Sequence, residues 1–166
     1  MELMDVIRTR RSIRKYKSDP VPEKDIEYAL EAARLAPSWA NKQCWRYIIV
    51  TDEALRKKIT LRDWAAQAPV IIVGCADPTK AGDREGRPYY MLDMGISMEH
   101  LILAAAEKGL GTCWLGGQFD EKTVKEALSI PDNMRVVALT PLGYPDESPP
   151  PKDRKSMSEM VSKNKW

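Results

Sequence analysis

The sequence predicts an α+β fold in which helices flank a central, mainly antiparallel sheet. Its 166 residues are 43% hydrophobic and 30% charged, which is the size and composition of one globular domain. Apolar residues recur at helical spacing in several segments, whereas residues 70–73 form the continuous apolar run of a strand buried on both faces. We therefore expect a single domain over residues 1–166, with 143–166 as an extended C-terminal arm.

Helices are predicted where apolar residues share one face and where capping residues mark the ends. Asp120 and Ser156 each precede a segment as an N-cap, and Pro37 and Gly109 each end one. The predicted helices span residues 2–9, 23–35, about 52–59, 89–108 and 120–128, with one short stretch before residue 69 and another after residue 156.

Strands are predicted at residues 45–50, 70–73 and 135–139, and the dipeptide Thr140-Pro141 is expected to end the third. Residues 10–16 are expected to be extended. Glycine and proline make residues 77–88 an irregular loop. Four prolines keep residues 143–151 out of a sheet interior, because proline lacks the N–H that a ladder needs.

Composition excludes several classes of protein. A total of 26 Lys and Arg against 24 Asp and Glu leaves a net charge of +2, which argues against a polyelectrolyte that coats nucleic acid. The three cysteines are widely spaced and form no disulfide framework. No apolar segment reaches the length of a membrane span. We expect a cytoplasmic protein with neither a nucleic-acid nor a membrane partner.

The residue types that carry most side-chain catalysis are scarce. His100 is the one histidine and lies in the middle of a predicted helix, so a Ser-His-Asp hydrolase and a zinc site are both disfavoured. Residues 109–114 begin like a dinucleotide fingerprint, but Trp114 stands at the third glycine position. We expect no metal and no catalytic side chain, which leaves chemistry carried by a cofactor, or simple binding.

Positive charge gathers at both ends of the chain. Residues 1–17 carry six cations and two acids, and residues 152–166 carry five cations and two acids. Such ends are either solvated tails or two segments that meet around one anion.

Arg10, Ser12 and Arg14 alternate, so in an extended segment they project to one face. Two guanidinium groups and a hydroxyl on one face match a phosphate monoester. Lys152 and Arg154 repeat the alternation after the prolines. The competing interpretation is an exposed basic edge strand.

Asn41 and Gln43 also alternate, in a loop that begins at Ser38. Two primary amides can offer donors and acceptors to a uracil-like edge, although ordinary loop hydrogen bonds explain them as well. Gly116-Gly117 would let the backbone approach a flat ring closely, or would simply make a tight turn.

Taken together and in their order along the chain, the segments described above resemble those of the FMN-dependent nitroreductase family. The resemblance covers nearly the whole chain and is carried by RRSIRKY at 10–16, APSWANKQCWRYIIV at 36–50, APVIIVGCA at 68–76, the helix and glycine turn at 93–117, and LGYPDESPPPKDRK at 142–155. Gln43-Cys44-Trp45 stands where the family usually has Gln-Pro-Trp. The chain also lacks the extra helices that shape the substrate pocket of larger members.

The resemblance implies a homodimer that holds FMN at each side of the subunit interface, with the helix at 89–108 as the dimer surface and the C-terminal arm reaching the partner. It implies hydride transfer from NADH or NADPH and reduction of nitroaromatic, quinone or related acceptors. The resemblance implies that the phosphate is bound by Arg10, Arg11, Ser12, Arg14, Lys152 and Arg154. It implies that the ribityl chain and ring are lined by Pro37, Ser38, Asn41 and Gln43. The reactive edge of the ring would be approached by Trp114, Leu115, Gly116 and Gly117.

Three alternatives stay open. A specialist flavoenzyme of the same fold, acting in reductive dehalogenation or flavin destruction, would need a lid, for which residues 77–88 are the candidate. A flavin-binding module without turnover would be yellow but would not be bleached by NAD(P)H. A small nucleic-acid binder using the basic ends would be colourless and would bind DNA with a steep salt dependence.

Overall fold

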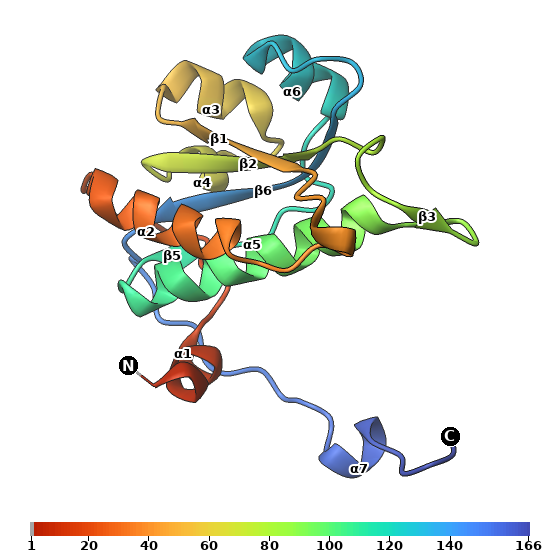
Figure 1. The fold of residues 1–166 in the computed structure, drawn as a ribbon. Coiled ribbons are helices and arrows are strands. Elements are labelled where there is room, and N and C mark those ends of the chain that lie inside the picture. The colour runs from red at the N-terminus through yellow and green to blue at the C-terminus, as the bar shows by residue number, and fades with distance from the viewer. Residues whose placement is uncertain (1) are drawn as a thin grey trace.

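The computed structural model describes residues 2–166 and has an antiparallel sheet with helices on both faces (Figure 1). Its helices are α1 (Leu3–Thr9), α2 (Glu23–Arg34), the 3-10 turn η1 (Trp39–Asn41), α3 (Glu53–Ile59), α4 (Asp63–Ala66), α5 (Tyr89–Glu107), α6 (Glu121–Leu128) and α7 (Met157–Met160). Its strands are β1 (Trp45–Val50), β2 (Val70–Ala76), β3 (Asp83–Arg84), β4 (Arg87–Pro88), β5 (Gly111–Thr112) and β6 (Arg135–Gly143).

The main sheet has the strand order β1-β2-β6-β5, and each neighbouring pair is antiparallel. Strand β2 lies inside the sheet and is buried along its whole length, as its apolar run predicts. Successive side chains of a strand point to opposite faces, so β2 serves two cores. Val70, Ile72 and Ala76 pack with α2 and α5, whereas Ile71, Val73 and Cys75 pack on the other face.

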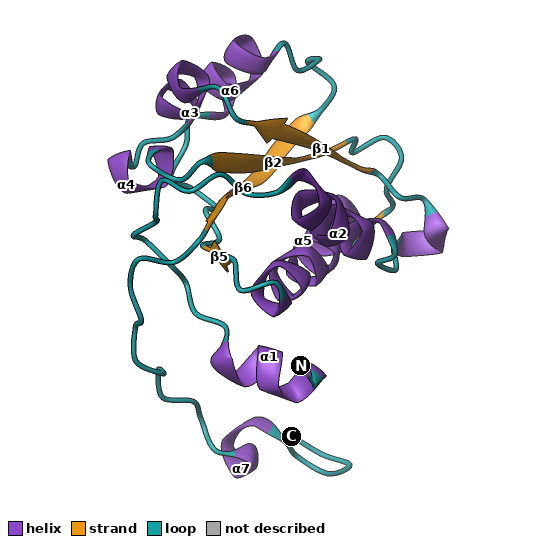
Figure 2. Cartoon of the chain, turned by 90° about the vertical axis from the view of Figure 1, so that its left-hand side faces the viewer, coloured by secondary structure: helices purple, strands orange, loops and turns teal. Residues whose placement is uncertain are grey.

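Helices cover both faces of this sheet (Figure 2). α2 and α5 lie side by side on one face, and α3, α4 and α6 lie on the other. The inner side of α5 carries Met94, Met98 and Leu101, all fully buried. Its outer side leaves Leu92 56% exposed and Ile96 41% exposed, so this helix presents an apolar surface that no part of residues 2–166 covers fully.

The predicted end of the third strand is wrong, because β6 continues through Thr140 and Pro141 to Gly143. Leu139 exchanges both of its backbone hydrogen bonds with Leu115, on the side away from β2. Backbone groups alternate in direction along a strand, so the N–H that Pro141 lacks would also point away from β2. The proline therefore costs the β2–β6 ladder no hydrogen bond.

Two further elements differ from the sequence prediction. Residues 77–88 are not wholly irregular, since Asp83–Arg84 and Arg87–Pro88 form a small antiparallel hairpin with Glu85 and Gly86 at positive φ. Strand β5 follows α5 directly and has only two residues, which is too short for a periodicity signal. The predicted capping box of the last helix is confirmed at Ser156 and Glu159.

The two ends of the chain lie side by side because residues 14–17 run antiparallel to residues 144–147. The Lys17 N–H donates to the Tyr144 carbonyl and the Asp146 N–H donates to the Lys15 carbonyl, each at 2.9 Å. An ion pair between Lys15 and Asp146, also 2.9 Å, joins the same segments. Beyond this pairing the arm runs down past α1 to α7 (Figures 1 and 2).

Within residues 2–166, none of the helices combines the length and the apolar character that crossing a membrane requires.

Candidate functional site

The paired ends of the chain enclose a cleft of about 500 Å³. It is lined by Ile7 and Arg8 of α1, by the following residues Arg10, Arg11, Ser12 and Arg14, and by Pro149, Pro150, Pro151, Lys152 and Arg154 of the arm. All six residues that the sequence predicts for a phosphate lie in this lining. Arg8 was not predicted, although its position at the end of α1, two residues before Arg10, is a signal for it.

The cleft is strongly cationic. Six of its lining residues are Lys or Arg, and none of the lining residues in the described part of the chain is acidic. Like charges held this close repel one another unless an anion lies between them. Arginine side chains at such a cleft can bind a phosphate through paired N–H donors. The arrangement therefore fits a dianionic ligand.

Arg11 departs from the strict alternation that the sequence predicts, since it lines the cleft beside Arg10 and Ser12. Its Nη1 donates to the carbonyls of Arg8 and Arg10, at 2.7 and 2.8 Å. Its Nε is one of two buried side-chain nitrogen or oxygen atoms in residues 2–166 that lack a hydrogen-bond partner. A buried donor without a partner is costly, and this one belongs to a residue that lines the cleft.

Strand β5 fixes the position of this basic segment. The Ile13 N–H donates to the Thr112 carbonyl at 2.9 Å, and Ser12 forms a parallel bridge with Thr112. Burial raises the pKa of the neighbouring Cys113 thiol, an effect that Arg14 and a hydrogen bond with Ser12 oppose. Cys113 follows Thr112, the residue that bridges Ser12, and is buried.

The predicted residues of the reactive edge follow Cys113 along the chain, and none of them belongs to the lining of the cleft among the described residues. Trp114 is 40% exposed, and Gly116 and Gly117 are exposed. Leu115 is 2% exposed and belongs to the core beneath the sheet. Leu115 can therefore meet a ligand only through its backbone, which its leucine side chain does not reveal in the sequence.

The loop predicted to hold the flavin ring has an unusual backbone. Ala40, Asn41 and Gln43 have positive φ of 46°, 54° and 48°. The Gln43 N–H donates to Ser38 Oγ at 2.9 Å, and Gln43 Nε2 donates to the carbonyl and to Oδ1 of Asn41, both at 3.2 Å. The two amides are thus partly engaged with each other, as ordinary loop chemistry predicts. Pro37 is exposed at the end of α2.

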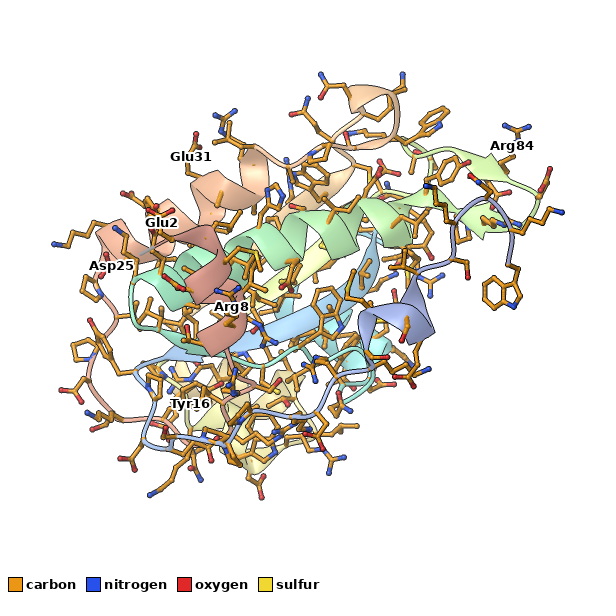
Figure 3. The ribbon with its side chains drawn as sticks, turned by 90° about the horizontal axis from the view of Figure 1, so that it is seen from below. Glu2, Arg8, Tyr16, Asp25, Glu31 and Arg84 are labelled. Carbon is orange, nitrogen blue, oxygen red and sulfur yellow. The ribbon has the colours of Figure 1, made fainter. Side chains whose placement is uncertain are left out.

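This loop lies at the other end of α5 from the cleft. Trp39 stacks on Tyr89, the first residue of α5, with 5.9 Å between ring centroids. Figure 3 shows Arg84 of the neighbouring hairpin at that end, whereas Arg8 and Tyr16 lie beneath the opposite half of the helix. From Tyr89 to Glu107 the helix is about 27 Å long at 1.5 Å per residue. One chain therefore brings together the six residues predicted for the phosphate, and residues 37–43 stand apart from them.

His100 lies within α5, as predicted, and is partly buried, with Nδ1 at 3.2 Å from the Ala32 carbonyl. In the part of the chain that the structure describes, no group of His, Cys, Asp and Glu side chains is arranged to hold a metal ion.

Comparison with known proteins identifies this architecture. The sequence model of the nitroreductase family matches residues 7–64 and 60–144. A nitroreductase family protein from Clostridium novyi NT has a solved structure with 40% sequence identity and a TM-score of 0.84, over 92% of this chain and 89% of that one. An FMN-dependent nitroreductase from Clostridium difficile R20291 has 28% identity and a TM-score of 0.87, over 98% and 99% of the two chains.

A curated relative has similar coverage. An NADH dehydrogenase from Thermus thermophilus is 32% identical over 189 residues, which covers 92% of this chain and 91% of that protein. Fold and sequence together define an oxidoreductase enzyme. The chain belongs to the nitroreductase family.

Proposed function

We propose that the chain acts as one FMN-binding domain, residues 1–166, that takes hydride from NADH or NADPH and reduces nitroaromatic, quinone or related acceptors. The observation that carries this proposal is the cleft between the two ends of the chain, whose lining holds six cations and no acid among the described residues, with Glu147 beside it accepting the Arg14 N–H. A phosphate monoester with two negative charges is the ligand that such a cleft fits. Family membership makes FMN the phosphate ester to expect there.

Each predicted group then has a physical task. Arg10, Ser12 and Arg14, with Lys152 and Arg154, bind the phosphate, and the unpartnered Nε of Arg11 supplies a further donor. Exposed Gly116 and Gly117 admit a flat ring to the backbone. Bound FMN would supply the chemistry of hydride acceptance and electron transfer, so the side chains need only bind and orient it. The absence of a catalytic histidine is consistent with this division of work.

A homodimer would complete the site. Residues 37–43 lie too far along α5 to meet a flavin in the cleft of their own chain, but a second copy packed on α5 could bring its loop to that cleft. The exposed Leu92 and Ile96 on α5 favour such a contact, because an apolar surface of this kind is normally buried against a partner. The arm of residues 143–166 ends in exposed Met157, Met160 and Val161, which could pack on the same partner.

Replacing Arg10 and Arg14 by alanine should release the flavin. We expect the purified native protein to carry about one FMN per chain and the Arg10→Ala/Arg14→Ala variant to lose at least about 100-fold in FMN affinity, since each lost charge-assisted hydrogen bond costs about 1.5–3 kcal/mol. The matched control is Lys58→Ala/Arg62→Ala, which removes two exposed cations elsewhere on the surface and should leave the affinity unchanged.

Two outcomes would contradict the proposal. Stoichiometric FMN retained by the Arg10→Ala/Arg14→Ala variant would remove the phosphate assignment. A flavin that neither NADH nor NADPH bleaches under anaerobic conditions would identify a binding module without turnover. The proposal predicts bleaching by at least one nicotinamide, followed by return of the yellow colour when a nitroaromatic or quinone is added.

A further inference from the structure

Asp93 is a buried residue on α5 whose carboxylate accepts hydrogen bonds from both ends of the Ser38–Cys44 loop. Its side chain is 3% exposed. Oδ1 accepts the backbone N–H of Trp39 at 2.9 Å, near the start of the loop. Oδ2 accepts the thiol of Cys44 at 3.7 Å, at the end of the loop where β1 begins.

This carboxylate is buried at a cost. Asp93 forms no ion pair with any of the described residues, and a charge taken out of water without a partner of opposite sign is destabilising. Its two hydrogen bonds go to the loop and to no other element. Ser97 lies one turn further along α5 and is equally buried, but it joins β1 and α2 through Tyr47 and the Ala33 carbonyl. Asp93 therefore contacts the loop, whereas Ser97 contacts the core elements β1 and α2, so substitutions at the two positions distinguish loop anchoring from core stability.

The loop needs an external support because its own backbone is strained. Ala40, Asn41 and Gln43 all have positive φ. Residues other than glycine keep this conformation only where surrounding contacts hold them. The hydrogen bonds among Ser38, Asn41 and Gln43 join the loop only to itself. Asp93, together with the stacking of Trp39 on Tyr89, connects it to the rigid helix.

We propose that Asp93 is the positioning residue that holds the Ser38–Gln43 loop in the conformation that receives the flavin. This inference rests on the proposed function, since it assigns a purpose to the same loop. Asp93 itself touches no cofactor and acts through the backbone of Trp39 and the thiol of Cys44. These contacts tie the loop to α5, so that the amides of Asn41 and Gln43 are in place before the cofactor arrives.

Three variants test the proposal on the full chain. Asp93→Ala removes both contacts and should weaken FMN binding at least about tenfold, because the loop must then be ordered at the expense of binding energy. Asp93→Asn keeps an oxygen acceptor for the Trp39 N–H and should stay within about threefold of the native affinity. Ser97→Ala is the matched control, which should lower thermal stability but leave FMN affinity unchanged.

Amide hydrogen exchange of the cofactor-free protein gives a readout that does not depend on FMN. The Trp39 N–H should exchange at least about tenfold faster in Asp93→Ala than in the native chain, and at the native rate in Ser97→Ala. Faster exchange with unchanged FMN affinity would overturn the inference while leaving the proposed function intact. Equal losses of affinity in Asp93→Ala and Ser97→Ala would also overturn it, since the effect would then be general destabilisation. A native chain that binds no FMN would overturn the proposed function and the inference together.

Discussion

Cys44 illustrates how a single residue of this chain departs from its family's usual sequence and what the departure does. The thiol replaces the proline of the usual Gln-Pro-Trp and donates to Asp93 Oδ2 inside the core. Burial, with the Asp93 carboxylate as a second cause, raises the pKa of the Cys44 thiol to about 11 from 9.0. The Cys44 thiol is thus protonated at neutral pH.

The raised pKa gives a stability prediction with a definite sign. The pKa of Cys44 is higher in the folded state than in the unfolded chain, so the folded state favours the protonated thiol. The contribution of this group to the free energy of unfolding is fully present below pH 9 and is lost as the pH rises through 11. A shift of this size corresponds to about 2–3 kcal/mol. The Cys44→Ser variant keeps a hydrogen-bond donor, but its hydroxyl does not titrate. Between pH 8 and pH 11, the free energy of unfolding should therefore decrease less for this variant than for the native chain. Denaturant unfolding at both pH values measures this, and parallel pH profiles would contradict it.

Most of the cationic residues of the cleft could be predicted from the sequence, because the alternation of Arg10, Ser12 and Arg14 is a local pattern, but Arg8 was not predicted. The roles of Asp93 and Leu115 could not be predicted. Asp93 reads as a polar residue in a helix, and only the packing of α5 beneath the loop shows where its carboxylate points. Leu115 reads as part of a ring-binding segment, but its bridge to Leu139 turns its side chain into the core.

At the scale of elements, the basic segment depends on a neighbour of two residues. β5 pairs with β6 at Gly111 and Thr112, and Thr112 in turn binds Ser12 and Ile13. Gly111 lies directly behind Ile13: a Cβ placed on it would be 2.7 Å from Ile13 Cγ1 and 3.0 Å from Pro145 Cγ. Only glycine lets the first segment and the arm approach β5 this closely.

Gly111→Ala should therefore displace the basic segment. We expect a loss of about 1–3 kcal/mol in the free energy of unfolding from overpacking, together with weaker FMN binding, measured by titration of the cofactor-free protein. Val124→Ala is the control, since Val124 is fully buried in the other core, among the helices on the opposite face. It should lose about 2 kcal/mol or more through a cavity and bind FMN normally. Normal FMN binding by the Gly111→Ala variant would contradict this prediction, because it would show that displacing the basic segment does not affect the cofactor.

The same scale explains which elements the sequence predicted well. β2, α5 and α6 carry strong local signals in the form of a buried apolar run, a long apolar helix and an Asp120 cap whose carboxylate accepts the Thr123 N–H at 2.8 Å. The extension of β6 past Pro141 and the existence of β5 depend on partners distant in the sequence. Periodicity cannot detect them, because a two-residue strand has no period.

For the whole molecule, the split charge distribution has a structural cause. Residues 14–17 and 144–147 pair with each other, so cations that are more than 130 positions apart in the sequence line one cleft. The loop at 37–43 stands at the far end of α5, which is why the proposed site needs a second copy. The order of segments predicted which residues line the cleft, and the family resemblance implied a homodimer. Only the fold shows that residues 37–43 lie at the far end of α5 from the cleft of their own chain.

The most direct test of the phosphate assignment compares FMN with riboflavin, which lacks the phosphate. The native chain should bind FMN at least about 100-fold more tightly, as expected when two or more charge-assisted hydrogen bonds are made to the phosphate. Lys152→Ala/Arg154→Ala should reduce this preference at least about tenfold, whereas Lys163→Ala/Lys165→Ala, which removes the same charge further along the exposed arm, should leave it unchanged. Equal affinities of the native chain for FMN and riboflavin would contradict the account.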